Sequence, residues 1–135
     1  MTLAIVRDRS AVMRHDIQVG SHTISTDLSL AEGGEDLGVT PHDLYDAALG
    51  ACKALTMMVY AKRKAMPLED VRVNVTRDAA DERAGTYRLQ CEIVVSGPLT
   101  EQQRAELLRV AQKCPIHKLM TEATTEVTTI MVAAT

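Results

Sequence analysis

Residues 40–65 constrain the fold of this chain more than any other stretch. Thr40 and Pro41 are typical of the cap and the first position of a helix, and Asp43 suits the positive end of a helix dipole. The pattern predicts a helix that continues to about Ala65, where basic residues and then Pro67 end it.

The middle of this predicted helix is apolar on nearly every side. Lys53 is its one charged residue between Ala47 and Ala61. A helix with this pattern is buried, so we expect either a sheet wrapped around it or a second subunit packed against it. Gly50 costs a helix about 1 kcal/mol relative to alanine, which predicts that another element approaches closely there.

The remaining residues predict an α+β fold in a single domain, residues 1–135. Val71, Val73 and Val75 alternate with polar residues, and apolar residues from Tyr87 to Val95 do the same. Thr100 opens a second helix with a capping box, and a short third helix follows Cys114-Pro115. Further strands are expected at Thr2–Arg7, Ala11–Val19, His22–Leu28 and Glu126–Val132, with a glycine-rich acidic loop at Ala31–Gly38.

Composition excludes several classes of function. The formal net charge is -3, which gives no general attraction to nucleic acid or to an anionic membrane. The chain has no Trp and no Phe, so base-stacking surfaces are not expected. No glycine-rich nucleotide motif is present, and we expect no cofactor. With no targeting or membrane-spanning segment in the sequence, we expect a cytoplasmic protein whose thiols start out reduced.

The three cysteines differ in their predicted environments. Cys91 lies in phase with the apolar face of a strand, which predicts a structural role. Cys52 is either a small core residue or a reactive thiol, and a reactive thiol in mid-helix needs a cation, most naturally an arginine. Cys114 lies at a helix N-cap, where either a buried thiol or a stabilised thiolate fits. A metal site made of Cys52, Cys114 and His42 or His117 is a weaker alternative.

Two segments resemble the OsmC/Ohr family, the osmotically inducible and organic hydroperoxide resistance proteins. The first is the proline-led helix that carries Gly50-Ala51-Cys52, and the second is Cys114-Pro115-Ile116-His117. The resemblance extends from about Gly20 to the C-terminus. It implies an intertwined homodimer in which two long central helices are wrapped by antiparallel sheets from both chains.

The resemblance also implies thiol peroxidase chemistry in oxidative-stress defence. Cys52 matches the peroxidatic position, which a small organic hydroperoxide oxidises to a sulfenic acid, and Cys114 matches the resolving position, which closes a disulfide. An external dithiol of the lipoyl or thioredoxin type is the expected reductant. The alternative is a non-catalytic or weakly active family member that binds a small ligand.

One position departs from the best-characterised branch of that family. There a glutamate follows the proline of the helix and orients an arginine from the N-terminal region. In this chain His42 occupies that position and Asp43 follows it, so Asp43 is the expected carboxylate. Arg7, Arg9 and Arg14 are the candidates for the activating arginine.

Overall fold

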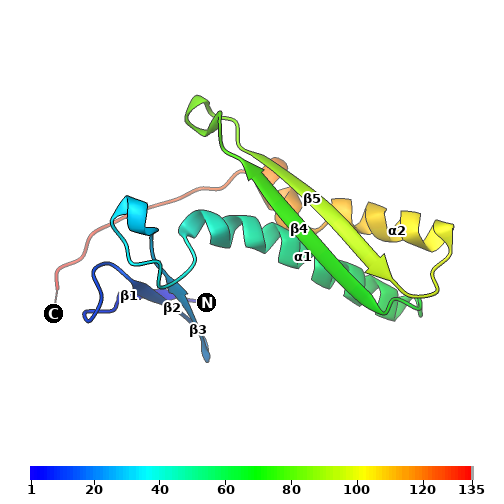
Figure 1. The fold of residues 1–135 in the computed structure, drawn as a ribbon, viewed down its shortest axis with the longest axis horizontal. Helices are drawn as coiled ribbons and strands as arrows, with labels where there is room; N and C mark the ends of the chain where they lie inside the picture. Colours follow the sequence, from blue (N-terminus) through cyan, green and yellow to red (C-terminus); the bar gives the residue numbers. More distant parts are fainter. Residues whose placement is uncertain (135) are drawn as a thin grey trace. The chain divides into compact units, whose positions relative to one another are not determined.

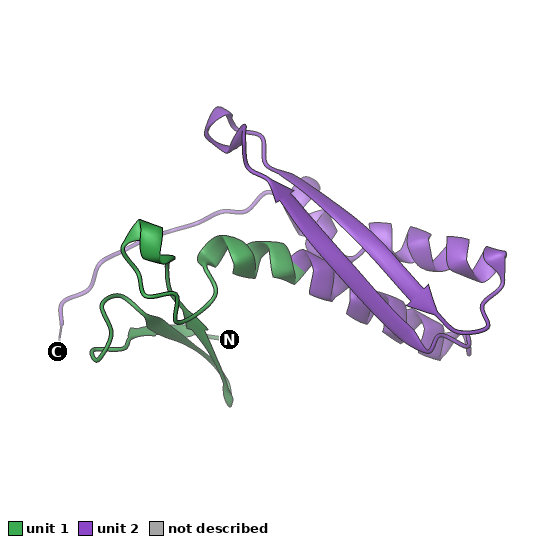
Figure 2. Cartoon of the chain, in the orientation of Figure 1, with its two compact units in different colours: residues 1–48 green, residues 49–135 purple. Residues whose placement is uncertain are grey.

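The computed structural model describes residues 1–134 and divides the chain into two compact units. The first unit is Met1–Ala48, and the second begins at Leu49 (Figure 2). The long helix α1 (Pro41–Arg63) starts in the first unit and continues in the second. None of the helices among the described residues is both long and apolar enough to cross a membrane.

The first unit contains a three-stranded antiparallel sheet in the order β1-β2-β3 (Figure 1). Its strands are β1 (Ala4–Arg7), β2 (His15–Val19) and β3 (His22–Thr26), all within the predicted ranges but shorter. Residues 8–14 form a turn instead of the start of a strand, because Asp8 accepts hydrogen bonds from the backbone N–H and hydroxyl of Ser10.

The predicted glycine-rich loop is organised by a buried carboxylate. Asp27 accepts backbone N–H bonds from Leu28, Glu35 and Leu37 at 2.7, 3.2 and 3.1 Å. Burial opposes ionisation of Asp27, but these three bonds outweigh it and lower the pKa of the carboxyl below its usual value. The 3-10 helix η1 (Leu30–Glu32) lies within this loop.

The start of α1 is confirmed. Thr40 Oγ1 accepts the backbone N–H of Asp43 at 3.1 Å, and Asp43 Oδ2 accepts the backbone N–H of Thr40 at 2.9 Å. These reciprocal bonds satisfy two donors that would otherwise lack partners, so Asp43 stabilises the helix end itself.

The second unit packs two helices against a hairpin. The hairpin strands are β4 (Asp70–Asp78) and β5 (Arg88–Ser96), joined through the 3-10 helix η2 (Glu82–Ala84). In the view of Figure 1 the hairpin crosses α1 and α2 (Glu101–Gln112), and the short helix α3 (Pro115–Thr121) follows α2. The predicted capping box of α2 at Thr100 is confirmed.

Alternation along both hairpin strands places one apolar face toward the helices, as predicted. Val71, Val73 and Val75 lie opposite Val95, Ile93 and Cys91, respectively. Several of these side chains pack against a buried cluster from α1 and α2: Met57, Ala61, Leu107 and Ala111. The core of the second unit therefore lies between the hairpin and the two helices.

The close approach expected at Gly50 is confirmed. A Cβ atom at Gly50 would lie 2.8 Å from Val75 Cγ2, closer than a van der Waals contact allows. The glycine therefore permits α1 to lie against β4 near Cys52.

Within one chain, α1 is covered along one face only, whereas the sequence indicated burial on nearly every side. Leu49, Met57 and Ala61 are buried, but Leu55 is 66% exposed and Val59 49% exposed.

The strand predicted at Glu126–Val132 is wrong. Residues 124–134 have no regular secondary structure, and Val127 and Ile130 are each 79% exposed. Apolar alternation indicated a strand, but a strand also needs a hydrogen-bonded neighbour, and this segment has none among the described residues.

We predict that Gly50→Ala destabilises the protein although alanine is the better helix former. Overpacking against Val75 costs about 1–3 kcal/mol, which exceeds the gain of about 1 kcal/mol in helix propensity. In a Val75→Ala background the clash is removed, so Gly50→Ala should stabilise by about 1 kcal/mol. Urea unfolding of the four proteins measures both effects, and additive changes would contradict the contact.

Candidate functional site

The candidate site lies in the second unit, where α1 meets the first turn of α3. Cys52 is half-buried on α1, and its Sγ accepts the backbone N–H of Ile116 at 3.5 Å. Thr56, one helical turn further on, places its hydroxyl 3.9 Å from the same sulfur. The sulfur of Cys52 therefore has polar neighbours from two elements.

Cys114 is fully buried at the N-cap of α3, as the sequence predicted. Pro115 occupies the first helical position, and the Cys114 thiol lies beside the Cys52 side chain. The fold thus brings together two thiols that are far apart in the sequence. Both are free cysteines in this structure.

Opposing influences act on the Cys114 thiol. Burial is the largest and raises the pKa of Cys114 above its usual value, and the neighbouring Cys52 side chain acts in the same direction. The backbone N–H of His117 and the ammonium of Lys53 favour the thiolate, but they do not overcome burial. The un-ionised thiol is therefore the favoured form of Cys114.

Lys53 is a cation that acts on the Cys114 thiol. Its side chain is buried, with Nζ 2.8 Å from the backbone oxygen of Ala111 and 2.9 Å from Nδ1 of His117. Because the ammonium can only donate, the His117 ring accepts at Nδ1 and carries its proton on Nε2. Lys53 thus joins α1 to the last turn of α2 and to α3.

In the sequence, Lys53 stands out as the one charge of an apolar stretch, but its contacts are not predictable there. The cation predicted beside Cys52 was an arginine. The signal was present in that isolated charge, since a buried lysine needs acceptors from neighbouring elements. The sequence pattern could not reveal which elements supply them.

Cys91 lies on the apolar face of a strand, the environment for which a structural role was predicted. It is half-buried on β5 and faces the helices together with Val95 and Ile93. Burial raises the pKa of the Cys91 thiol above its usual value, although the ammonium of Lys53 acts against this. An un-ionised thiol on an apolar strand face fits a packing residue.

The predicted activating residues lie in the first unit. Asp43 caps α1, and Arg14 pairs with Asp16 at 3.3 Å. Arg7 donates to the backbone oxygen of Val12 at 3.3 Å, and Arg9 is exposed. An arginine beside Cys52, oriented by Asp43, stays a prediction.

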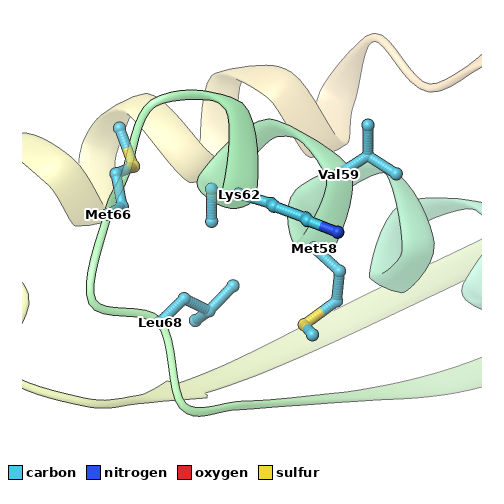
Figure 3. Close-up of a pocket in the computed structure, with 6 residues that line it drawn as sticks. Met58, Val59, Lys62, Met66 and Leu68 are labelled. Carbon is cyan, nitrogen blue, oxygen red and sulfur yellow. The ribbon is translucent and has the colours of Figure 1, made fainter.

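No cluster of metal-ligating side chains is evident among the described residues. No group of three or more His, Cys, Asp or Glu side chains there is placed to hold an ion. A cavity of about 370 Å³ opens beside the C-terminal half of α1 (Figure 3). It is lined by Met58, Val59, Ala61, Lys62, Met66 and Leu68, and Cys52 is not part of the lining.

Solved structures of known proteins share this α+β fold. An OsmC-like protein from Mycoplasma pneumoniae is 18% identical, with a TM-score of 0.71 over 90% of this chain and 86% of that one. An organic hydroperoxide resistance protein OsmC from Legionella pneumophila is 20% identical, with a TM-score of 0.63 over 90% of each chain. The organic hydroperoxide resistance protein OhrB of Bacillus subtilis is also 20% identical, with a TM-score of 0.59 over 90% and 92%.

At these identities the likeness concerns the fold. A comparison with curated proteins found no match. The family model described as OsmC-like protein matches residues 33–129, a range that includes Cys52, Cys91 and Cys114. Because this match spans well over half of the sequence, the chain belongs to the OsmC-like protein family.

Proposed function

We propose that this protein is a thiol peroxidase that reduces small organic hydroperoxides. The observation that carries the proposal is that Cys52 meets the start of α3, which Cys114 caps: the backbone N–H of Ile116, two residues after Cys114, donates to the Cys52 sulfur at 3.5 Å. Family membership adds support, since solved relatives are described as organic hydroperoxide resistance proteins. The role that we propose for this activity is defence against oxidative stress in the cytoplasm. We assign it to residues 1–135 as a single domain.

Cys52 is the proposed nucleophile because it is the more accessible thiol of the pair, half-buried where Cys114 is fully buried. The backbone N–H of Ile116 donates to its sulfur at 3.5 Å. The thiolate is the form of a cysteine that attacks a peroxide.

In the first step, the Cys52 thiolate attacks the distal oxygen of the hydroperoxide. The S–O bond forms as the O–O bond breaks, and the leaving alkoxide takes up a proton to become the alcohol. Cys52 has lost two electrons and is a sulfenic acid.

In the second step, the Cys114 sulfur attacks the oxidised Cys52 sulfur. The S–S bond forms, the S–O bond breaks, and the departing hydroxide combines with the Cys114 proton to give water. The two side chains lie beside each other, which supports this step. An external dithiol of the lipoyl or thioredoxin type then reduces the disulfide by exchange.

We predict that one equivalent of cumene hydroperoxide removes two hydrogen atoms from the mass of the reduced protein. Peptide mapping should locate the new disulfide between Cys52 and Cys114, because these two thiols are already in contact. Intact-mass spectrometry followed by digestion under non-reducing conditions makes the measurement.

Cys91→Ser is the matched control for this experiment, since it removes a half-buried thiol outside the proposed pair. It should form the same disulfide as the unmodified chain, whereas Cys52→Ser should not react. An unchanged mass after peroxide treatment would remove the peroxidase proposal and favour the small-ligand-binding alternative. Oxidation that persists in Cys52→Ser would also contradict it.

We also propose that two chains associate through the uncovered face of α1. Leu55, Met58 and Val59 are exposed apolar side chains on this helix, and they are 66%, 45% and 49% exposed. Exposed apolar side chains gathered on one helix are typical of a contact with another surface. A homodimer is the assembly that the family resemblance implies.

We predict a mass of about 29 kDa in solution, twice the 14.7 kDa of one chain. Leu55→Glu should shift the protein toward the monomer, because a charge buried at an apolar contact is costly. Light scattering after size-exclusion chromatography measures both. Val94→Glu, at an exposed position of β5, is the control and should leave the mass unchanged. A monomeric unmodified chain would contradict the proposal.

A further inference from the structure

The positive charge of Lys53 lies in the protein interior, where a charged group is poorly solvated and costs free energy to bury. Its side chain is 5% exposed, and its two recorded bonds go to an uncharged carbonyl and an uncharged imidazole nitrogen. No ion pair with a carboxylate is recorded for it within the part of the chain that the structure describes. The C-terminal end of α2 offers partial negative charge, which compensates the ammonium only in part. A buried ammonium without a paired carboxylate stabilises negative charge that forms beside it, because the low dielectric strengthens their attraction.

Two residues, Ala111 and His117, connect the Lys53 ammonium to Cys114. The backbone oxygen of Ala111 accepts both from Lys53 Nζ at 2.8 Å and from the backbone N–H of Cys114 at 3.4 Å. The His117 ring accepts from Lys53, while the backbone N–H of His117 donates to the Cys114 sulfur. Lys53 and Cys114 therefore share two neighbours, the Ala111 carbonyl and His117.

The buried position of Cys114 makes its thiolate costly to form. Its side chain is fully buried, and burial raises the pKa of the Cys114 thiol above its usual value. To attack the Cys52 sulfur it must transiently carry negative charge where water is excluded. A fixed positive charge nearby is the group that lowers the cost of that state.

We propose that Lys53 is the counter-charge of the resolving thiolate and accelerates the attack of Cys114 on an oxidised Cys52. This role rests on the proposed thiol chemistry of the site. Negative charge develops on the Cys114 sulfur as its proton passes to the group that leaves Cys52. In this role Lys53 contributes charge and no proton.

The titratable groups around the ammonium come from every element packed against it. His117 and Cys114 belong to α3 and its cap, Cys91 to β5, and Cys52 to the same helix as Lys53. Ala111 supplies only a backbone carbonyl from α2. A pH profile must therefore be measured on a reaction whose rate depends on the ionisation of Cys114 and not on that of the other groups.

An aromatic disulfide such as dithionitrobenzoate isolates the attack of Cys114 without any peroxide. In a Cys91→Ala background, Cys52 displaces the first thionitrobenzoate and retains the second as a mixed disulfide. Cys114 then attacks the Cys52 sulfur, the internal S–S bond forms, and the second thionitrobenzoate leaves. The absorbance of this second release gives its rate directly.

We expect Lys53→Met to slow the second release about tenfold at pH 7, with the difference shrinking toward pH 9.5 as more Cys114 ionises unaided. Lys53→Gln keeps an N–H donor but no charge, and it should be as slow as Lys53→Met. Lys53→Arg keeps the charge and should stay within about threefold of the parent. Lys113→Met removes an exposed lysine next to Cys114 and should change the rate less than about twofold.

If Lys53→Gln releases the second thionitrobenzoate as fast as the parent does, the proposal is overturned. The hydrogen bonds of Lys53, and not its charge, would then set the rate. A Lys53→Met rate slowed equally at pH 7 and pH 9.5 would overturn it too, since that result indicates displacement of α3. A chain that shows the second release but no oxidation by peroxide would leave the role of Lys53 intact and remove the peroxidase function. Absence of the second release in the parent overturns both.

Discussion

The ammonium of Lys53 makes two hydrogen bonds that tie together three helices of the second unit. One bond holds the last turn of α2 through the Ala111 carbonyl, and the other holds α3 through the His117 ring. Because α3 is short, its position depends on these ties and on the turn that precedes it. That position places the N–H of Ile116 at the Cys52 sulfur and the N–H of His117 at the Cys114 sulfur.

The different surroundings of the two thiols explain the different steps assigned to them. Cys52 is half-buried and its sulfur accepts the N–H of Ile116, which suits the attack on a hydroperoxide proposed for it. Cys114 is fully buried, and burial raises the pKa of its thiol, which suits the resolving step proposed for it. The proposed division between nucleophile and resolving group thus rests on the difference in burial.

Local sequence signals predicted much of the fold. The cap at Thr40, the alternation of the hairpin strands and the close approach at Gly50 all follow from residues near one another in the chain. The predicted strand at Glu126–Val132 failed because a strand also needs a neighbour, which alternation alone does not supply. Burial of α1 was predicted on nearly every side, and a single chain covers one face.

The candidate site was predictable only in part. Cys52 and Cys114 were singled out by their motifs, but their contact depends on tertiary packing across the second unit. Lys53 was visible as an isolated charge, yet its partners Ala111 and His117 are distant in the sequence. No local pattern predicts such a bond, because neither partner is marked by the residues around it in the sequence.

Trapping of the sulfenic acid tests most directly whether Cys52 is the thiol that attacks the peroxide. In a Cys114→Ser variant the oxidised sulfur has no resolving partner, so dimedone added with cumene hydroperoxide can capture it. The account predicts one dimedone adduct per chain, located on Cys52 and increasing in proportion to the peroxide added. An adduct on Cys91, or none at all, would contradict it.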